Sequence, residues 1–149
     1  MNLAILTPSL SALPQPSVEE IGDLADRGYR SIIGNRPDGE APDQPTWNDL
    51  KAAALAGGME AVHIPVVASQ IDEADIGAFR EALERLPKPI AAFCRTGTRS
   101  TILWALANEG SQSPNERIRI AASQGYDLEP FRPRIEASRA STSVAGKTA

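Results

Sequence analysis

The sequence predicts an α/β protein in which a mainly parallel central sheet is flanked by helices. Short apolar runs that suit buried strands alternate with stretches in which apolar residues recur at helical spacing. Short connections between repeated helix-then-strand units favour parallel strands. The 149 residues suffice for a single sizeable core. We therefore expect one domain over residues 1–138, followed by a small, polar and disordered tail over residues 139–149.

The N-terminal third carries a clear helix signal between two apolar runs. Ser17 and Glu20 have the spacing of a capping box, in which the serine accepts from the third helical amide and the glutamate reaches back. Gly28 is a natural C-terminal stop for that helix. We expect a strand over residues 3–6, a proline-rich connection over 9–16, a helix over 17–27, a strand over 29–34 and a loop over 35–45.

The rest of the chain continues the alternation. Ser69 or Asp72 can cap a helix in which apolar residues recur at helical spacing, and Ser113 with Glu116 forms a second capping box. Pro114 then takes the first position of that helix, where the backbone N–H that proline lacks would have no partner within the helix. We expect one helix over residues 47–56 and a second that begins at its cap, residue 69 or 72, and ends at residue 86. A third helix is expected over residues 100–108, and a fourth begins at residue 114 and stops at Gly125. Strands are expected over residues 61–67 and 90–93.

Composition excludes several classes of protein. One cysteine cannot close an internal disulfide, and one cysteine with one histidine cannot build a Cys/His zinc site, so we expect no metal and no cofactor. The net charge is −4 without a basic stripe, which argues against nucleic acid as a partner. No apolar stretch is long enough to span a bilayer, and residues 1–10 lack the features of a signal peptide. We therefore expect a cytoplasmic protein.

The most informative stretch is residues 89–103, where an apolar strand delivers Cys94 into a loop that opens a helix. Backbone N–H groups of such a loop can form a nest for an anion at the helix N-terminus. Together with two arginines they favour the thiolate, which is the nucleophilic form of cysteine. The candidate ligands of the sulfur or its substrate are Arg95, Thr96, Gly97, Thr98, Arg99 and Ser100.

A plainer interpretation of Cys94 is a buried small hydrophobe at the end of a strand. The flanking cations and Gly97 favour a reactive thiol, because packing alone does not require them.

Loop length separates two kinds of chemistry. Cysteine phosphatases carry five residues between cysteine and arginine, and rhodanese-type sulfurtransferases typically have one fewer. Between Cys94 and Arg99 there are 99 − 94 − 1 = 4 residues, which matches the shorter loop. A smaller cradle suits one sulfane sulfur atom better than a tetrahedral phosphate.

Longer motifs resemble one particular family. These are LPQPSVEEIGDLADRGYRSIIGNRPDGE (13–40), AVHIPV (61–66), AAFCRTGTRS (91–100) and AASQGYDL (121–128). Over about residues 3–135 the chain resembles the beta-lactamase-hydrolase-like, phosphatase-like family. The resemblance implies a fold similar to dual-specificity phosphatases together with sulfurtransferase activity. It also implies a persulfide dioxygenase or a sulfide:quinone oxidoreductase as a partner in sulfide detoxification.

Two departures from phosphatases weigh against phosphate-ester hydrolysis. The position expected for an acidic residue, a few residues after Pro65, is Ala68, and Phe93 stands where phosphatases commonly have histidine. Asp72 or Glu73 could supply an acid only if the loop folded back. Both are more simply carboxylates at the start of a helix.

We therefore expect a sulfurtransferase in which Cys94 takes sulfur from a sulfane-sulfur donor and passes the resulting persulfide to a thiol acceptor. Arg99 and the loop amides stabilise the negative charge, and Arg95 orients the donor at the mouth. Thr98 and Ser100 can donate hydroxyls to the sulfur, although Ser100 is equally suited to cap the helix.

Two further positions have competing interpretations. Arg36 and Asp38, in the motif NRPDGE, follow a parallel strand at the sheet edge where ligands collect, so they are candidate substrate-binding residues. The alternative is an ion pair of Arg36 with Asp38 or Glu40 that stiffens the turn. His63, within a strand, is expected to be a hydrogen-bonded structural residue.

Two rival functions use the same cysteine. The first is a tyrosine or dual-specificity phosphatase acting through a phosphocysteine. The second is a non-catalytic sensor that holds a persulfide and signals by binding a partner.

Overall fold

The structure is a computed structural model that describes residues 1–107 and 110–138. It contains a five-stranded sheet in the order β1-β2-β5-β3-β4. The first pair of strands is antiparallel and the other three pairs are parallel. The predicted α/β class with a mainly parallel sheet is therefore confirmed, and the tail expected over residues 139–149 lies outside the described residues.

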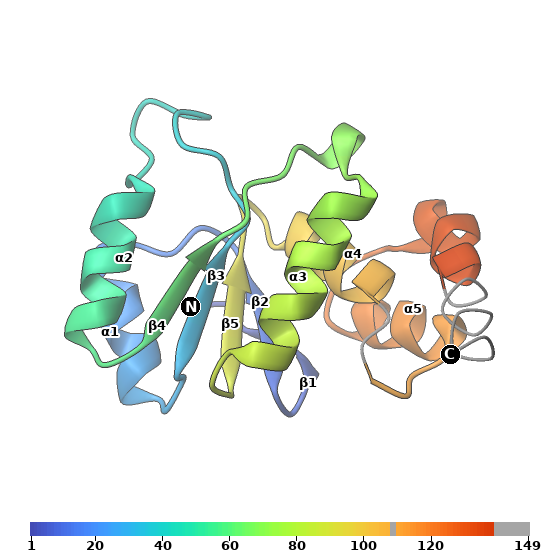
Figure 1. The fold of residues 1–149 in the computed structure, drawn as a ribbon, viewed down its shortest axis with the longest axis horizontal. Coiled ribbons are helices and arrows are strands. Elements are labelled where there is room, and N and C mark those ends of the chain that lie inside the picture. The colour runs from blue at the N-terminus through green and yellow to red at the C-terminus, as the bar shows by residue number, and fades with distance from the viewer. Residues whose placement is uncertain (108–109, 139–149) are drawn as a thin grey trace.

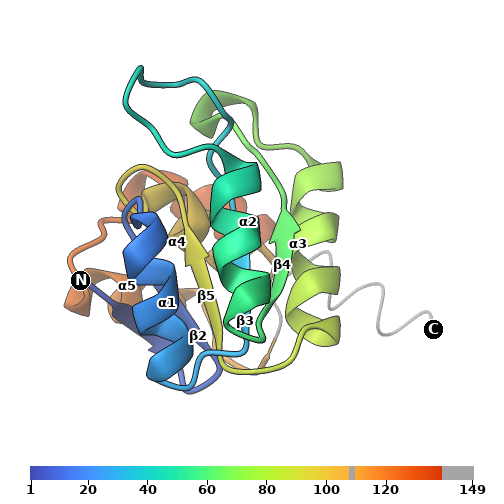
Figure 2. The same cartoon turned by 90° about the vertical axis from the view of Figure 1, so that its left-hand side faces the viewer.

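Helices cover both faces of the sheet (Figure 1). The strands are β1 (Ala4–Thr7), β2 (Leu10–Leu13), β3 (Ser31–Gly34), β4 (Glu60–His63) and β5 (Ile90–Phe93), and the helices are α1 (Val18–Asp26), α2 (Trp47–Ala56), α3 (Glu73–Arg85), α4 (Thr98–Ala107) and α5 (Pro114–Ser123). Helices α1 and α2 pack together on one face, and α3 and α4 on the other, with α5 outside α4 (Figures 1 and 2). Short 3-10 turns lie at Ala68–Gln70 and Glu129–Phe131.

The helix starts follow the sequence signals closely. Ser17 and Glu20 form a complete capping box at α1, as Ser113 and Glu116 do at α5. Of the two caps considered for α3, the structure uses Asp72. Helix α4 starts at Thr98, two residues earlier than expected, because the turn at residue 97 already leads into helical geometry. The end of the chain adds helical residues 132–138, which the sequence analysis did not anticipate.

Strand β2 is the main element that the sequence analysis missed, since residues 9–16 were expected to be only a connection. Leu10–Leu13 pairs antiparallel with β1 and parallel with β5, and all four residues are buried. Prolines on both sides gave the stretch the composition of a loop, but none falls inside the paired segment. Strand β4 is shorter than the expected 61–67 and ends at His63.

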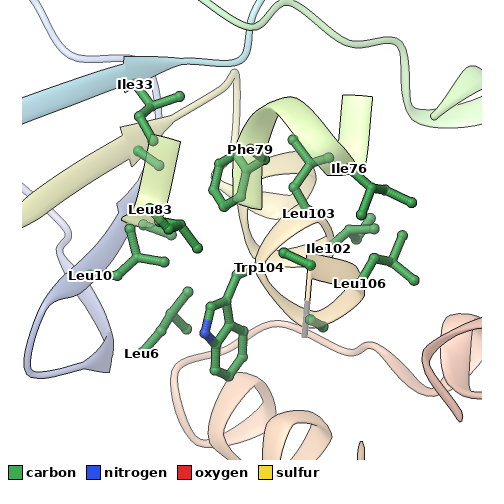
Figure 3. Close-up of a cluster of buried hydrophobic side chains, with 14 of the residues drawn as sticks. Leu6, Leu10, Ile33, Ile76, Phe79, Leu83, Ile102, Leu103, Trp104 and Leu106 are labelled. Atoms are coloured by element: carbon green, nitrogen blue, oxygen red, sulfur yellow. The ribbon is translucent and has the colours of Figure 1, made fainter. Parts of the chain in front are cut away.

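Two apolar clusters flank the sheet. Ile32, Ala91 and Phe93 point toward α1 and α2, whereas Ile33 and Ala92 point toward α3 and α4. Figure 3 shows part of the second cluster, in which Leu6, Leu10, Ile33, Ile76, Phe79, Leu83, Ile102, Leu103, Trp104 and Leu106 are labelled. Every residue of α4 from Ser100 to Ala107 is buried. Helix α4 is thus a rigid support for the loop that precedes it.

Within the described residues, none of the helices is long and apolar enough to cross a membrane.

Candidate active site

Cys94 lies directly after β5, the middle strand of the sheet. Because β2, β5, β3 and β4 run parallel, their carboxyl ends meet at one edge, and open α/β sheets bind ligands at this edge. The cysteine is only 1 % exposed. Its sulfur therefore lies at the floor of the site rather than on an open surface.

The loop from Cys94 to Arg99, here called the cysteine loop, turns its backbone toward the sulfur. The N–H of Gly97 donates to Cys94 Sγ at 3.1 Å, and α4 starts at the next residue. The sulfur thus faces the positive end of a buried helix, an arrangement that favours an anion. Thr101 secures the turn by donating its hydroxyl to the Gly97 carbonyl at 2.8 Å.

Gly97 is required at its position for two separate reasons. Its φ is +92°, a conformation that residues with side chains rarely adopt. A Cβ atom there would also collide with the hydroxyl of Tyr126.

Arg99 is held by the loop over residues 35–40, here called the NRPDGE loop. Its guanidinium donates from Nη1 to Glu40 Oε2 and from Nη2 to Glu40 Oε1, both at 2.8 Å. Nη1 also donates to the Val66 carbonyl at 2.9 Å. Such a two-point contact fixes the plane of the guanidinium as well as its position. The two loops meet at this ion pair.

The Arg99–Glu40 pair shifts the ionisation of both groups. The hydrogen bond from Arg99, supported by one from Arg36, lowers the pKa of the Glu40 carboxyl from 4.5 to about 2. The hydrogen bond to Glu40 raises the pKa of Arg99, and the charge of Cys94 raises it further. Arg99 therefore lies within electrostatic reach of the sulfur, and Glu40 is a carboxylate at neutral pH.

A buried hydrogen-bonded pair ties the strand ends together beneath the loops. Ser100 Oγ donates to Asn35 Oδ1 at 2.7 Å, and Asn35 Nδ2 donates to the Ile64 carbonyl at 2.9 Å. The backbone N–H of Asn35 donates to the Phe93 carbonyl at 2.8 Å. Ser100 is thus neither the cap of α4 nor a donor to Cys94. It joins α4 to the residue that follows β3.

The other predicted loop residues take different places. Arg95 and Thr96 are exposed at the mouth, and the Thr96 and Thr98 hydroxyls bond to each other at 2.9 Å. In the NRPDGE loop, Arg36 is buried and donates from Nε to Glu40 Oε1 at 3.0 Å. Asp38 accepts the N–H of Trp47 at the start of α2 at 2.8 Å. The ion pair considered for Arg36 is therefore the one with Glu40.

His63 and Asp72 have structural contacts. His63 Nε2 lies 3.1 Å from the Arg36 carbonyl, and its ring stacks on Trp47 with centroids 4.8 Å apart. Asp72 accepts the N–H of Asp75 at the start of α3, and Ala68 lies in a short turn. Glu40, which contacts Arg99 directly, is the carboxylate that the structure brings to the cysteine loop.

Three contributors to the site escaped the sequence analysis in these roles: Asn35, Glu40 and Tyr126. Asn35 and Glu40 stand in the NRPDGE motif, in which Arg36 and Asp38 were the candidate residues, and Tyr126 stands in AASQGYDL, a motif noted only for its resemblance. Their partners are 65, 59 and 30 residues away in sequence. The presence of the motifs indicated that these residues matter. Their spacing in the sequence does not show which residue contacts which partner.

Comparison with known sequences gives consistent results. Residues 2–111 match the family model described as beta-lactamase hydrolase-like protein, phosphatase-like domain. The beta-lactamase hydrolase-like protein of Xylella fastidiosa strain Temecula1 is 36 % identical over 130 residues, which are 86 % of this chain and 30 % of that protein. The corresponding Agrobacterium fabrum protein is 35 % identical over the same span. The chain thus spans about 30 % of the length of these relatives.

Solved structures with the same fold include a candidate phosphatase (nma1982) of Neisseria meningitidis Z2491, with a TM-score of 0.82 and 34 % identity, covering 93 % of this chain and 99 % of that one. PTPMT1 has a TM-score of 0.75 at 15 % identity and covers 99 % of both chains. P. aeruginosa TpbA, solved in complex with pTyr, has a TM-score of 0.64 at 15 % identity, covering 95 % of this chain and 90 % of that one. These likenesses confirm the expected cysteine-phosphatase-like fold.

Proposed function

Because the chain belongs to the family of beta-lactamase hydrolase-like, phosphatase-like domains, we propose that it is a cysteine-dependent phosphatase that hydrolyses phosphate monoesters through Cys94. The observation that carries this proposal is the position of the sulfur. Cys94 Sγ accepts the Gly97 N–H at the start of α4, with Arg99 fixed beside it. A family of phosphatase-like domains and a phosphatase-like fold support hydrolysis better than sulfur transfer, which the sequence analysis ranked first.

In the first step, Cys94 Sγ attacks the phosphorus atom of the ester. A P–S bond forms while the P–O bond to the leaving group breaks, and the electron pair goes to that oxygen. The N–H groups of the cysteine loop and the Arg99 guanidinium bind the remaining phosphoryl oxygens, whose charge they are placed to stabilise.

The leaving oxygen needs a proton unless it is a weak base. Glu40 is the carboxylate next to Arg99, but its pKa of about 2 keeps it ionised at neutral pH. It therefore serves as the counter-ion that orients Arg99 and not as a general acid. We expect aryl phosphates, whose phenolate is a good leaving group, to be better substrates than alkyl phosphates.

In the second step, water attacks the phosphocysteine. The P–S bond breaks, inorganic phosphate leaves and the Cys94 thiolate is restored. No internal thiol can intercept this intermediate, because the chain has a single cysteine.

Sulfur transfer is the second candidate, and one specific observation favours it. Only four residues separate Cys94 from Arg99. The cysteine loop is therefore smaller than a loop with five residues between the cysteine and the arginine. Cys94 Sγ would attack the outer sulfur of thiosulfate, the S–S bond would break, and sulfite would leave without a general acid. A thiol would then collect the sulfur, and a persulfide dioxygenase or sulfide:quinone oxidoreductase partner belongs to this hypothesis.

The two candidates are separated by one set of assays. Purified chain is incubated with an aryl phosphate, and separately with thiosulfate and cyanide, alongside Cys94→Ser. Release of inorganic phosphate that depends on Cys94 supports the proposal. Formation of thiocyanate without phosphate release would overturn it in favour of sulfur transfer. The mass of Cys94 after rapid quenching adds a direct check, since it gains either a phosphoryl group or one sulfur atom.

A further inference from the structure

Both tyrosines of the chain occupy the same place in the same local motif. Tyr29 follows Gly28 at the end of α1, and Tyr126 follows Gly125 at the end of α5. In each case the glycine has a positive φ, +94° and +95°. The tyrosine N–H returns to a carbonyl five residues earlier, Leu24 at 3.1 Å and Ala121 at 2.9 Å. This is the Schellman motif, which fixes the direction of the chain after a helix.

The two tyrosine hydroxyls differ in what they touch. The Tyr29 hydroxyl forms a hydrogen bond of 2.7 Å with Oγ of Ser11, which lies in strand β2. The Tyr126 hydroxyl donates to the carbonyl of Thr96 at 3.0 Å, inside the cysteine loop. Tyr126 lies beyond residues 2–111, which the family model covers. Helix α5, packed beside α4 (Figure 1), thus delivers one polar atom to the site.

That contact acts on the peptide group that faces the sulfur. The carbonyl of Thr96 and the N–H of Gly97 belong to one trans peptide, so they point in opposite directions. Tyr126 donates to the carbonyl at one end, and the N–H at the other end donates to Cys94 Sγ at 3.1 Å. A donor on the carbonyl polarises the peptide and strengthens its N–H as a donor.

The close fit at Gly97 supports the same role. A Cβ there would collide with the Tyr126 hydroxyl, so the ring lies against the peptide it bonds.

We propose that Tyr126 is a positioning residue for the nucleophile: by bonding to the Thr96 carbonyl, it orients and polarises the Gly97 N–H that stabilises the Cys94 thiolate. This inference rests on Cys94 being the nucleophile of the proposed function, but not on which group it transfers. Burial, and then the negative charge of Cys94, raise the pKa of Tyr126, so its hydroxyl stays protonated and remains a donor at working pH.

The test measures Cys94 directly and needs no substrate. The chain has one cysteine, so alkylation by iodoacetamide reports on Cys94 alone, and its rate is followed against pH. Tyr126→Phe should shift the midpoint of the profile to higher pH and slow alkylation at neutral pH about 3- to 10-fold, the effect of one hydrogen bond. Arg99 and Tyr126 are two groups on which the charge of Cys94 acts, and the Arg95 side chain follows Cys94 directly in the chain.

Tyr29→Phe is the matched control, because it removes the other tyrosine hydroxyl from the same motif. Its profile should coincide with that of the unaltered chain. Tyr126→Leu, which removes ring and hydroxyl together, should match Tyr126→Phe. An unshifted profile for Tyr126→Phe, an equal shift for Tyr29→Phe, or a shift confined to Tyr126→Leu would each overturn the proposal. Thermal unfolding of every variant verifies that it is folded. A chain that released no phosphate could still show the shift, so the two proposals fail separately.

Discussion

The cysteine loop and the NRPDGE loop leave neighbouring strands of one sheet, but they bring charge to the site by different means. The cysteine loop presents backbone, with the Gly97 N–H on Cys94 Sγ and the helix start behind it. The NRPDGE loop presents side chains, with Glu40 held between Arg36 and Arg99. Backbone donors are fixed by local geometry, whereas a side-chain ion pair depends on two distant segments meeting. The first loop therefore supplies the reactive centre, and the second keeps one arginine in place.

Cys94→Ser should produce the largest change, because it removes the nucleophile and leaves both loops intact. We expect activity to fall by at least about 10³-fold, as for other nucleophile removals. Thermal unfolding should be nearly unchanged, since serine fits the same space. Phosphate release and the melting temperature measure the two effects. Activity that survived this substitution would place the chemistry outside the cysteine loop.

Gly97→Ala should have the next largest effect, because it disturbs the backbone of the cysteine loop. Positive φ alone costs roughly 1–2 kcal/mol for a residue with a side chain, and the collision with Tyr126 adds to that. We expect the rate of phosphate release to fall by about 100-fold or more, since misplacement of about 1 Å can have that effect.

Gly28→Ala is the control for Gly97→Ala. It has almost the same φ, +94° against +92°, and open space for a Cβ. It should lower the free energy of unfolding by a similar strain cost and leave activity unchanged. Equal activity losses in both variants would mean that general destabilisation, and not the shape of the cysteine loop, sets the rate.

Glu40→Gln tests the NRPDGE loop and should have a smaller effect on activity. A neutral amide at this position cannot give Arg99 the charged two-point contact, so the guanidinium loses its fixed plane. We expect kcat to fall about 10- to 100-fold. Asp43→Asn removes the same charge from an exposed position nearby and should leave kcat unaltered. A similar fall in both variants would show that net charge, not the position of Arg99, matters.

The smallest predicted effect is the pH dependence of stability. The pKa of Glu40 is lowered from 4.5 to about 2 by folding, so its stabilisation is present above pH 4.5 and is lost as pH falls through about 2. The unaltered chain should exceed Glu40→Gln in unfolding free energy by about 1 kcal/mol at neutral pH, a modest value because the pair is partly exposed. Denaturant unfolding of both chains across this pH range measures the difference. A constant difference down to pH 2 would contradict the assignment.

The parts of the fold that the sequence predicted well are those with local causes. Capping boxes at Ser17 and Ser113 placed the starts of α1 and α5, since a cap and its partner are three residues apart. Strand β5 ends at Phe93 as expected. Strand β2 was missed because its identity comes from pairing with β1 and β5, which no pattern within Leu10–Leu13 reveals.

The site likewise combines features with local causes and contacts between distant segments of the chain. The sequence predicts that Cys94 follows a buried strand and that a glycine-containing turn and a helix come after it, because these features are contiguous in the chain. The contacts of Arg99 with Glu40, of Ser100 with Asn35, and of Tyr126 with the peptide facing the sulfur arise only in the folded chain. These contacts join segments that are 30 to 65 residues apart. They exist because parallel strands bring their carboxyl ends to one edge, a consequence of the packed sheet that sequence spacing cannot specify.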